Sequence, residues 1–440
     1  MNRRHFLATV GAAGAGLTAA RGLGAEGETG IPAVGLIGCG WYGVRNLQNF
    51  MAHARVNVVS LCDVNSQFLA DAREKIAAAG AAPELRTFGD FRLMLASRHH
   101  DIVLVGTPDH WHALPAIAAM QAGADVYLEK PVSLDVIEGE ALVAAARKYG
   151  RVVQVNTQRR STPHLAAARD KYIRSGRIGR VGLVETFSYL TGRIDHFVPD
   201  AEPPSHLDYD FWTGPAPMLP FKPIKESRQW RNFTAYGNGQ IGDLGVHMFD
   251  LARWMLGLGW PQSVHSTGGI YVDTKSCADI TDTQQTTFVY PQSEVRWRHQ
   301  TWGVAPFPIH HWSDGWGIQL LGKEGTLVLT LMGYTFTPAD GPADTYRLDP
   351  SFSDNPTAEA ERLHCLNFLA ARRTRSRPIA DIAEGHVSTA SCVLGNVSRR
   401  LGRPVAYDPA TRTVPGDAEA TALLSRAYRS PWVHPTPENV

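Results

Sequence analysis

From residue 31 onward, short apolar runs of strand length alternate with longer segments of helical periodicity. The predicted strands are 33–37, 56–61, 102–105, 126–128 and 152–155, and the predicted helices between them are 44–54, 66–79, 113–122 and 134–149. Strands that alternate with helices in this way are typical of a parallel sheet covered on both faces. The pattern therefore predicts an α/β, doubly wound domain of the Rossmann type over residues 31–155.

After about residue 156 the pattern changes. The predicted strands become longer and richer in Thr, Tyr and Trp, and several alternate polar with apolar positions: 183–189, 283–290, 295–302, 318–321 and 326–331. Such alternation indicates a half-buried antiparallel sheet. Helices are predicted at 358–372 and 382–401. We therefore predict a second, α+β domain over residues 156–440, with an open, mainly antiparallel sheet.

One connection in this second part is rich in proline. It covers residues 198–223 and is too long to be a simple link between strands. We expect it to have a function of its own.

The first 25 residues have the layout of an export signal. The basic pair Arg3 and Arg4 precedes a weakly apolar run over 7–20, and small residues follow at 24–25. An arginine pair in this place resembles a twin-arginine (Tat) signal, which predicts an exported, periplasmic protein that crosses the membrane already folded. The alternative is a cytoplasmic protein with a frayed basic tail.

Composition excludes several classes of function. The 440 residues carry a net charge of +1, so nothing indicates a nucleic-acid partner. Outside the N-terminal signal no stretch is long and apolar enough to span a bilayer, so no membrane partner is expected for the mature form. The five cysteines show no CxxC spacing, which argues against a disulfide framework and against a thiolate metal site.

A glycine-rich motif follows the first predicted strand and opens a helix. It consists of Gly38, Cys39, Gly40, Trp41, Tyr42 and Gly43. In this GxGxxG pattern the glycines permit a tight turn, close approach to a pyrophosphate and close helix–strand packing. Asp63 ends the next strand, where a carboxylate binds the ribose of NAD and repels the extra phosphate of NADP. The motif therefore predicts NAD as the cofactor, with NADP disfavoured.

Two further strand ends carry candidate residues. Gly106 is followed by Thr107 and Pro108, and the strand 126–128 is followed by Glu129, Lys130 and Pro131. In doubly wound sheets ligands lie beyond the carboxyl ends of the strands, so both segments are expected at the cofactor cleft. Lys130 is a candidate to hydrogen-bond a substrate hydroxyl, or else a salt-bridge partner of Glu129. Pro131 is a candidate for a cis peptide bond.

The remaining candidates are histidines and their neighbours. His110 and His112 form an H-x-H pair, but a third ligand is not evident, so no metal site is predicted. Asp243 and His247 stand four residues apart and share one face if the segment is helical. The carboxylate would then orient the imidazole for general base catalysis, or Asp243 would only cap the helix.

These motifs together resemble the glucose–fructose oxidoreductase / inositol dehydrogenase (Gfo/Idh/MocA) family. The matching segments run in family order: GLIGCGWYG, VGTPDHWHA, AGADVYLEKPVSL, GDLGVHMFDLARWMLG and RPIADIAEGH. The resemblance implies that Lys130, Asp243 and His247 surround the substrate carbon at the nicotinamide. It also implies that Thr107, Pro108 and His112 belong to the cofactor site, and that the second sheet serves homo-oligomerisation.

The predicted function is an NAD-dependent oxidoreductase acting on a hydroxyl of a sugar, polyol or glycoside. Whether Lys130 or His247 is the base stays open at this stage. Because an exported enzyme has no replenished NAD pool, the cofactor is expected to be retained and recycled. Two alternatives remain: a redox-neutral, NAD-dependent glycosidase or lyase, and a nucleotide-binding sensor without turnover.

Overall fold

We describe the fold from a computed structural model of the chain. It describes residues 30–440 apart from 81–83, 191, 226–227 and 350–354. Ile31–Val440 forms one compact unit. The predicted export signal lies outside the described residues. Among the described residues, no helix combines the length and the hydropathy that crossing a membrane would require.

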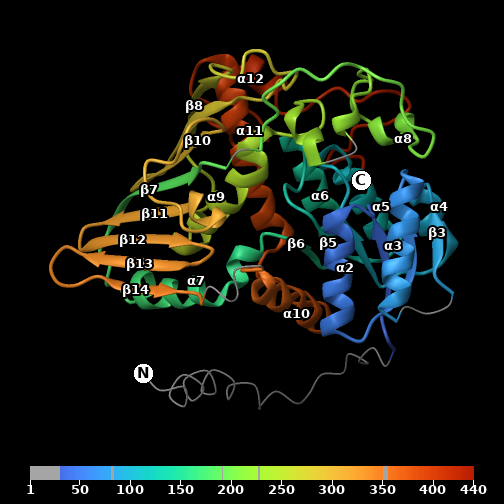
Figure 1. The fold of residues 1–440 in the computed structure, drawn as a ribbon, viewed down its shortest axis with the longest axis horizontal. Coiled ribbons are helices and arrows are strands. Elements are labelled where there is room, and N and C mark those ends of the chain that lie inside the picture. Colours follow the sequence, from blue (N-terminus) through green and yellow to red (C-terminus); the bar gives the residue numbers. More distant parts are fainter. Residues whose placement is uncertain (1–29, 81–83, 191, 226–227, 350–354) are drawn as a thin grey trace. The chain divides into compact units, whose positions relative to one another are not determined.

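The first sheet has six strands, all parallel, in the order β3-β2-β1-β4-β5-β6 (Figure 1). Their bounds are β1 Ala33–Ile37, β2 Asn57–Cys62, β3 Arg86–Phe88, β4 Ile102–Val105, β5 Asp125–Leu128 and β6 Val153–Val155. The predicted Rossmann-type sheet is therefore confirmed. The strand order reverses between β1 and β4, and this switch point is where such sheets bind their ligands.

Helices cover both faces of this sheet. They are α2 Trp41–His53, α3 Ser66–Ala78, α4 Phe91–Ser97, α5 Ala113–Gln121 and α6 Val136–Lys148. In α2 the fully buried Leu47 and Phe50 lie at helical spacing and pack on the sheet. Phe50 also meets Phe368 of α10 (Ala358–Thr374), with ring centroids 6.0 Å apart. A helix from the end of the chain thus completes the cover of the Rossmann sheet.

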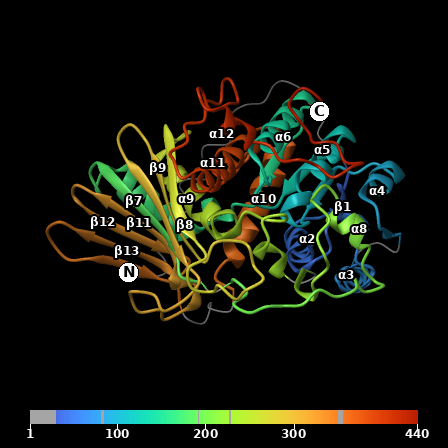
Figure 2. The same ribbon diagram turned by 90° about the horizontal axis from the view of Figure 1, so that it is seen from above.

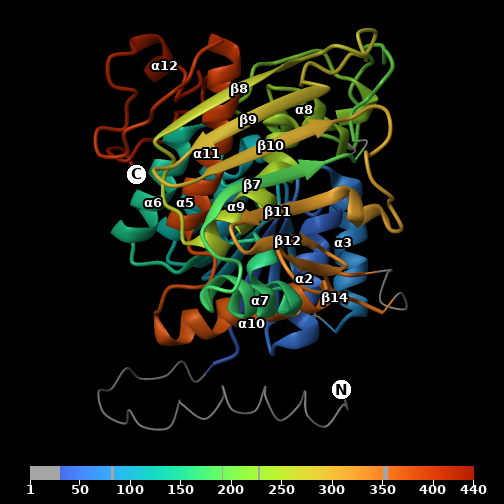
Figure 3. The same ribbon diagram turned by 90° about the vertical axis from the view of Figure 1, so that its left-hand side faces the viewer.

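The second sheet has eight strands in the order β14-β13-β12-β11-β7-β10-β9-β8 (Figure 3). Neighbours are antiparallel except for the parallel pair β7–β10 near the middle, so the sheet is mainly antiparallel, as predicted. The bounds are β7 Val181–Ser188, β8 Ser263–Gly269, β9 Thr283–Val289, β10 Glu294–Gln300, β11 Trp316–Gly322, β12 Gly325–Thr330, β13 Gly333–Pro338 and β14 Asp344–Arg347.

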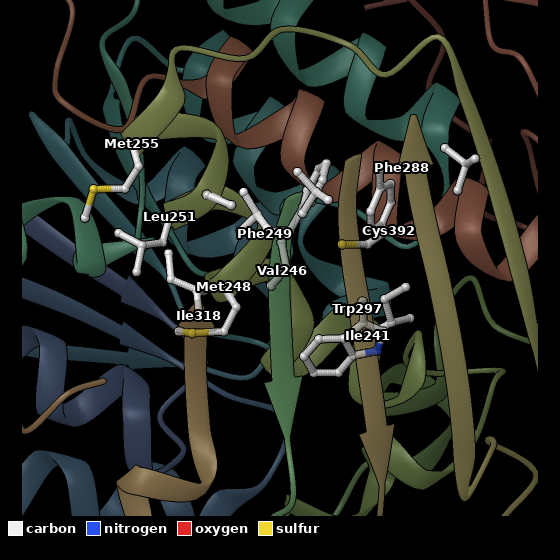
Figure 4. Packing of buried hydrophobic residues seen from close by; sticks show 14 of the residues in the cluster. Ile241, Val246, Met248, Phe249, Leu251, Met255, Phe288, Trp297, Ile318 and Cys392 are labelled. Carbon is white, nitrogen blue, oxygen red and sulfur yellow. The ribbon is translucent and has the colours of Figure 1, made fainter. Parts of the chain in front are cut away.

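Two helices cover one face of this second sheet and separate it from the Rossmann domain: α9 (Val246–Leu256) and α11 (Ile382–Leu401) (Figure 2). Met248, Phe249 and Leu251 of α9 are buried against the sheet, where Phe249 meets Phe288 of β9 at a ring distance of 4.1 Å (Figure 4). Burial of such side chains stabilises each by about 1.5–3 kcal/mol. The remaining short helices are α7 Pro163–Ala168, α8 Tyr209–Thr213 and α12 Ala418–Ala422.

The proline-rich connection lies against the Rossmann domain. We call residues 198–225 the strap. Leu207 pairs with Asn65 in an isolated β-bridge, and the Asp208 amide donates to the Val64 carbonyl at 3.1 Å. The strap therefore lies beside the end of β2, where the predicted ribose-binding carboxylate is found.

The C-terminal segment 425–440 fastens the strap from its other side. The Arg429 guanidinium pairs with the Asp210 carboxylate at 2.6 Å and donates to the Gly214 carbonyl at 2.9 Å. The Trp432 ring packs edge-on against Trp111, at 4.8 Å, and against Phe211 at 5.5 Å. The strap is thus held between the Rossmann domain and the end of the chain.

Candidate active site

The glycine loop between β1 and α2 has the geometry that close packing requires. Gly38 has a φ of +93°, and a side chain there would meet Gly106 backbone at 2.6 Å. A Cβ on Gly43 would lie 2.0 Å from the Gly38 carbonyl oxygen. A Cβ on Gly40, in contrast, would meet nothing within 4 Å. Gly38 and Gly43 therefore serve packing, whereas Gly40 keeps open the space that the loop faces.

The first turn of α2 faces the same space. The helix begins after Gly40, and no side chain caps its amide groups. Uncapped amides at the start of a helix of this length attract anions such as a pyrophosphate. Both Trp41 and Tyr42 line the adjoining cavity.

The cavity has a volume of about 370 Å³ and lies along the carboxyl ends of β1, β2 and β4. Its walls include Gly38, Gly40, Asp63, Thr107 and Pro108 from the Rossmann domain. The opposite wall is formed by the strap and the residues after it, among them Leu207, Phe211, Trp212, Arg228 and Arg231. A ligand bound here would be enclosed by two parts of the chain that lie far apart in sequence.

Asp63 lies in this cavity as predicted. Its carboxylate accepts hydrogen bonds from the Cys39 amide at 2.6 Å and from the Asn65 amide at 2.8 Å. Burial raises the pKa of this carboxyl group to about 6, although the backbone donors favour its ionised form. The carboxylate thus fixes the glycine loop and lies in the cavity wall, where the sequence predicts that a ribose binds.

Glu129 and Lys130, which follow β5, take different directions. The buried Glu129 carboxylate accepts from the side-chain amides of Asn46 and Asn156, each at 2.6 Å. It therefore supports the sheet edge and does not pair with Lys130, so the salt-bridge alternative is wrong. The Lys130–Pro131 peptide bond is cis.

Lys130 reaches across to the second domain. Its ammonium group donates to the Asp243 carboxylate at 2.6 Å and to the Asp243 carbonyl at 3.0 Å. Arg231, which lines the cavity, lies 3.3 Å from the same carboxylate. Burial would raise the pKa of Asp243, but Lys130 and Arg231 together lower it to about 2. Asp243 is therefore ionised and joins the lysine to the wall of the cavity.

His247 stands one turn after Asp243, in the first turn of α9, and is 4 % exposed. Burial, followed by the charges of Lys130 and Arg159, lowers the pKa of the imidazole well below its usual value. The ring is therefore neutral, and Lys130 is near enough for its charge to act on it. Within the described part of the chain, Nδ1 of His247 has no hydrogen-bond partner.

The predicted contact between Asp243 and His247 is wrong. The chain from Ile241 to Gly245 is a π-helical turn, and it directs the Asp243 carboxylate to Lys130 and Arg231. The imidazole packs instead edge-on against the Trp316 ring, with centroids 5.4 Å apart. Packing against tryptophan, and not a carboxylate, sets the orientation of His247.

Several other predicted cofactor residues lie behind the cavity wall. The His112 ring contacts the carbonyls of Pro131 and Thr107, so it ties two strand ends together. His110 contacts the Trp212 carbonyl at 2.9 Å and thus fastens the strap. Cys39 is buried and contributes its backbone amide to Asp63. Thr107 and Pro108 do line the cavity.

The sequence did not reveal the residues that the strap region brings to the site. Arg231 and Arg228 lie just beyond the strap, and the Arg228 guanidinium stands 4.7 Å from the Trp41 ring. Asp109, buried after β4, also lies near Lys130, and burial raises its pKa to about 7. The length of the proline-rich connection was the only signal for Arg228 and Arg231, whereas Asp109 lies in the loop after β4 that the sequence already placed near the nicotinamide.

These residues fit a dinucleotide. The open space above Gly40, the uncapped α2 amides and the Asp63 carboxylate are the elements that hold a pyrophosphate and a ribose. Fold and site together define an NAD-binding oxidoreductase. Residues 33–157 match the family model described as "Oxidoreductase family, NAD-binding Rossmann fold", and residues 182–290 match its "C-terminal alpha/beta domain". The chain belongs to the Gfo/Idh/MocA oxidoreductase family.

Individual relatives are more distant. The chain is 30 % identical over 230 residues to the levoglucosan dehydrogenase of Pseudarthrobacter phenanthrenivorans. This match covers 51 % of each chain. It is 29 % identical over 171 residues to a glycosyl hydrolase family 109 protein of a Shewanella species. This match covers 34 % of this chain and 37 % of that protein. The matches to these curated relatives thus span about half of their length or less.

A solved structure resembles the chain over a greater length. It is a levoglucosan dehydrogenase in complex with NADH and L-sorbose, with a TM-score of 0.66 and 19 % identity, covering 85 % of this chain and 98 % of the other. At this identity the likeness concerns the fold.

Proposed function

We propose that the protein transfers hydride between NAD and a hydroxyl-bearing carbon of a sugar, polyol or glycoside. The observation that carries this proposal is the ion pair between Lys130 and Asp243. It joins the loop after β5 in the Rossmann domain to the turn that begins the helix of His247. The charge of Lys130 acts on the neutral imidazole of His247, and Arg231 links Asp243 to the wall of the cavity. The names of the relatives, levoglucosan dehydrogenase among them, support a carbohydrate substrate.

The two side chains suit different parts of this reaction. Two N–H groups of Lys130 bond to Asp243, which leaves the third to donate to a substrate oxygen. His247 is neutral, and Nδ1 of its ring has no hydrogen-bond partner within the described chain, so it can accept the hydroxyl proton. We therefore assign proton removal to His247 and positioning of the oxygen to Lys130. When bound, NAD supplies the hydride acceptor.

We further propose that the protein is exported and keeps its cofactor. The strap supports retention because it lines the cavity, and the Arg429–Asp210 ion pair fastens it to the segment 425–440. A bound dinucleotide could leave only if these contacts opened. Retention would allow repeated turnover, with a second substrate restoring the cofactor.

The test is a single-turnover reduction of the bound cofactor by a panel of sugars, polyols and glycosides. The panel is run on the wild type, on Lys130→Met and on His247→Ala, and reduced nicotinamide is followed by its absorbance. We expect the wild type to respond to at least one compound and both variants to be slower by about 100-fold or more. Full rates in either variant would contradict the role assigned to that residue. No response of the wild type to any compound would contradict the proposed function.

A second candidate is a redox-neutral glycosidase or lyase. The match to a glycosyl hydrolase family 109 protein favours it. In such a reaction the cofactor ends in the state in which it began. Release of the aglycone from a chromogenic glycoside, with no net change in nicotinamide absorbance, would identify this activity.

A further inference from the structure

Two adjacent arginines follow β6 and differ in how they are paired. Arg160 forms two hydrogen bonds with the buried Asp250 carboxylate, at 2.7 and 2.8 Å. Arg159 is equally buried, 4 % exposed, but its Nε and Nη1 atoms have no hydrogen-bond partner within the described chain. A buried charge without a counter-charge is costly, and Arg160 has one in Asp250, whereas Arg159 contacts the Trp316 ring but pairs with no carboxylate among the described residues.

The carboxylate whose charge acts on Arg159 is already paired with another arginine. The Glu361 carboxylate, which belongs to α10, accepts from Arg45 at 3.0 and 3.1 Å. Burial lowers the pKa of the Arg159 guanidinium to about 10, and the nearby Tyr42 and Glu361 offset only part of this effect. The guanidinium therefore stays charged at neutral pH without an anion of its own.

Arg159 also lies next to the proposed reaction centre. Its guanidinium carbon stands 4.8 Å from the centroid of the Trp316 ring, the ring that the His247 imidazole contacts at 5.4 Å. Further buried polar atoms without partners lie on the same segment, namely Thr157 Oγ1 and Gln158 Oε1. Orphaned polar atoms that cluster beyond the end of a parallel strand indicate a place for a polar ligand.

We propose that Arg159 binds an anionic substituent of the substrate, so that the enzyme acts on acidic sugars in preference to neutral ones. This inference rests on the proposed function and specifies its substrate class. A carboxylate or a phosphate would supply the missing negative charge and accept the hydrogen bonds that Nε and Nη1 lack. A neutral sugar would leave the guanidinium buried and without a counter-charge.

The experiment compares sugars that differ only in the substituent at C6: D-glucose with D-glucuronate, D-galactose with D-galacturonate, and D-glucose 6-phosphate as the phosphate arm. Reduction of bound NAD gives kcat/KM for the wild type, Arg159→Met and Arg159→Lys. The control is Arg73→Met, an arginine exposed on α3. Melting temperatures show whether each variant is folded.

We expect the wild type to prefer the anionic member of a pair by at least about 10-fold. Arg159→Met should reduce this preference by about 10- to 100-fold, the range for a hydrogen bond to a charged group, and Arg159→Lys should retain part of it. Arg73→Met should leave it unchanged. If the phosphate replaces the uronates as the preferred substrate, the anion is a phosphate. Equal use of neutral and anionic members by the wild type would overturn the inference, even if Arg159→Met failed to fold.

A second measurement separates this inference from the proposed function. Binding of D-glucuronate, D-glucose and D-glucose 6-phosphate to the NADH-loaded protein is measured by calorimetry, which requires no turnover. Arg159-dependent binding of an anionic sugar without turnover of any sugar would contradict the proposed function and leave the inference standing. Turnover of sugars with a selectivity that does not depend on Arg159 would support the proposed function and contradict the inference.

Discussion

Asp243 bonds across the domain boundary to Lys130, at 2.6 Å, and not along its own helix to His247. The carboxylate therefore acts on the lysine of the Rossmann domain, while the imidazole is placed by Trp316. This arrangement makes Asp243 a positioning residue that orients the Lys130 ammonium. The same carboxylate also pairs with Arg231 in the wall of the cavity, so it links Lys130 to that wall.

Asp243→Asn should lower the single-turnover rate by about 100-fold. The amide keeps the shape of the carboxylate but loses the charge that holds Lys130 and Arg231 together. The measurement is the rate of reduction of bound NAD at saturating substrate, with KM recorded separately. Asp170→Asn is the matched control, because in the described part of the chain Asp170 forms an ion pair only with Arg174, on an exposed surface. A rate within threefold of the wild type would remove Asp243 from the mechanism.

Substitution of alanine at Gly40 and at Gly43 should affect different properties, namely cofactor binding and stability. Gly40→Ala should fold with an unchanged melting temperature, because its Cβ meets nothing and its φ of −65° suits any residue, yet it should bind NAD at least 10-fold more weakly. Gly43→Ala should lose about 1–3 kcal/mol of stability, because its Cβ would collide with the Gly38 carbonyl. Thermal denaturation and the cofactor content of the purified proteins test both effects. Full cofactor content in Gly40→Ala would show that the pyrophosphate lies elsewhere.

Arg429→Ala should speed the release of the cofactor by about 10-fold or more. The substitution removes the ion pair with Asp210 and the bond to the Gly214 carbonyl, which fasten the strap. Release is followed by exchange of bound NAD for a labelled cofactor. Glu438→Gln serves as the control, since it breaks an exposed pair with Arg412 in the same terminal segment without touching the strap. Equal rates of cofactor exchange in the wild type and both variants would mean that the contacts of Arg429 with the strap do not limit cofactor release.

Stability should fall as the pH is lowered from about 6.5 towards 4. Burial lowers the pKa of His110 to about 3 and those of His112 and His364 to about 4, so these rings are neutral in the folded protein. The unfolded chain binds their protons below about 6.5 and is favoured as the pH falls. Asp109 and Asp63, with pKa values raised to about 7 and about 6, oppose this trend, but the histidines outnumber them, since burial also lowers the pKa of His100 and His299 to about 4. Urea denaturation midpoints at a series of pH values check the sign, and a midpoint that rises below pH 6.5 would contradict it.

The sequence predicted the Rossmann strands well because each is a short, fully buried apolar run between turn residues. β1 and β4 were predicted at their observed bounds. β3 was missed, since its three residues are largely exposed, and β8 was missed, since Gly268 and Gly269 weaken its strand pattern. The strands β13 and β14 were missed as well, and β13 is not an edge strand, so the residue pattern fails wherever a strand is short or only partly buried.

The candidate site was only partly predictable, for a different reason. Motifs singled out Lys130, Asp243 and His247, and the structure joins the first two, but spacing along a helix suggested the wrong partner for Asp243. A π-helical turn changes the direction of a side chain without a signature in the residue pattern. Arg231 and Arg159 depend on contacts between distant segments, and nothing local distinguishes Arg159 from Arg160.

The position of β7 has a consequence for how the protein folds. This strand lies between β10 and β11, so Leu183 pairs with Glu294 and Ser188 with Trp316. The strap, the Asp243 turn and α9 all lie within the loop that these pairings close. Contacts of such large sequence separation form late and slowly. The catalytic constellation should therefore assemble in a single cooperative step with closure of the sheet, and a fragment that ends before β10 should not acquire even a partial site.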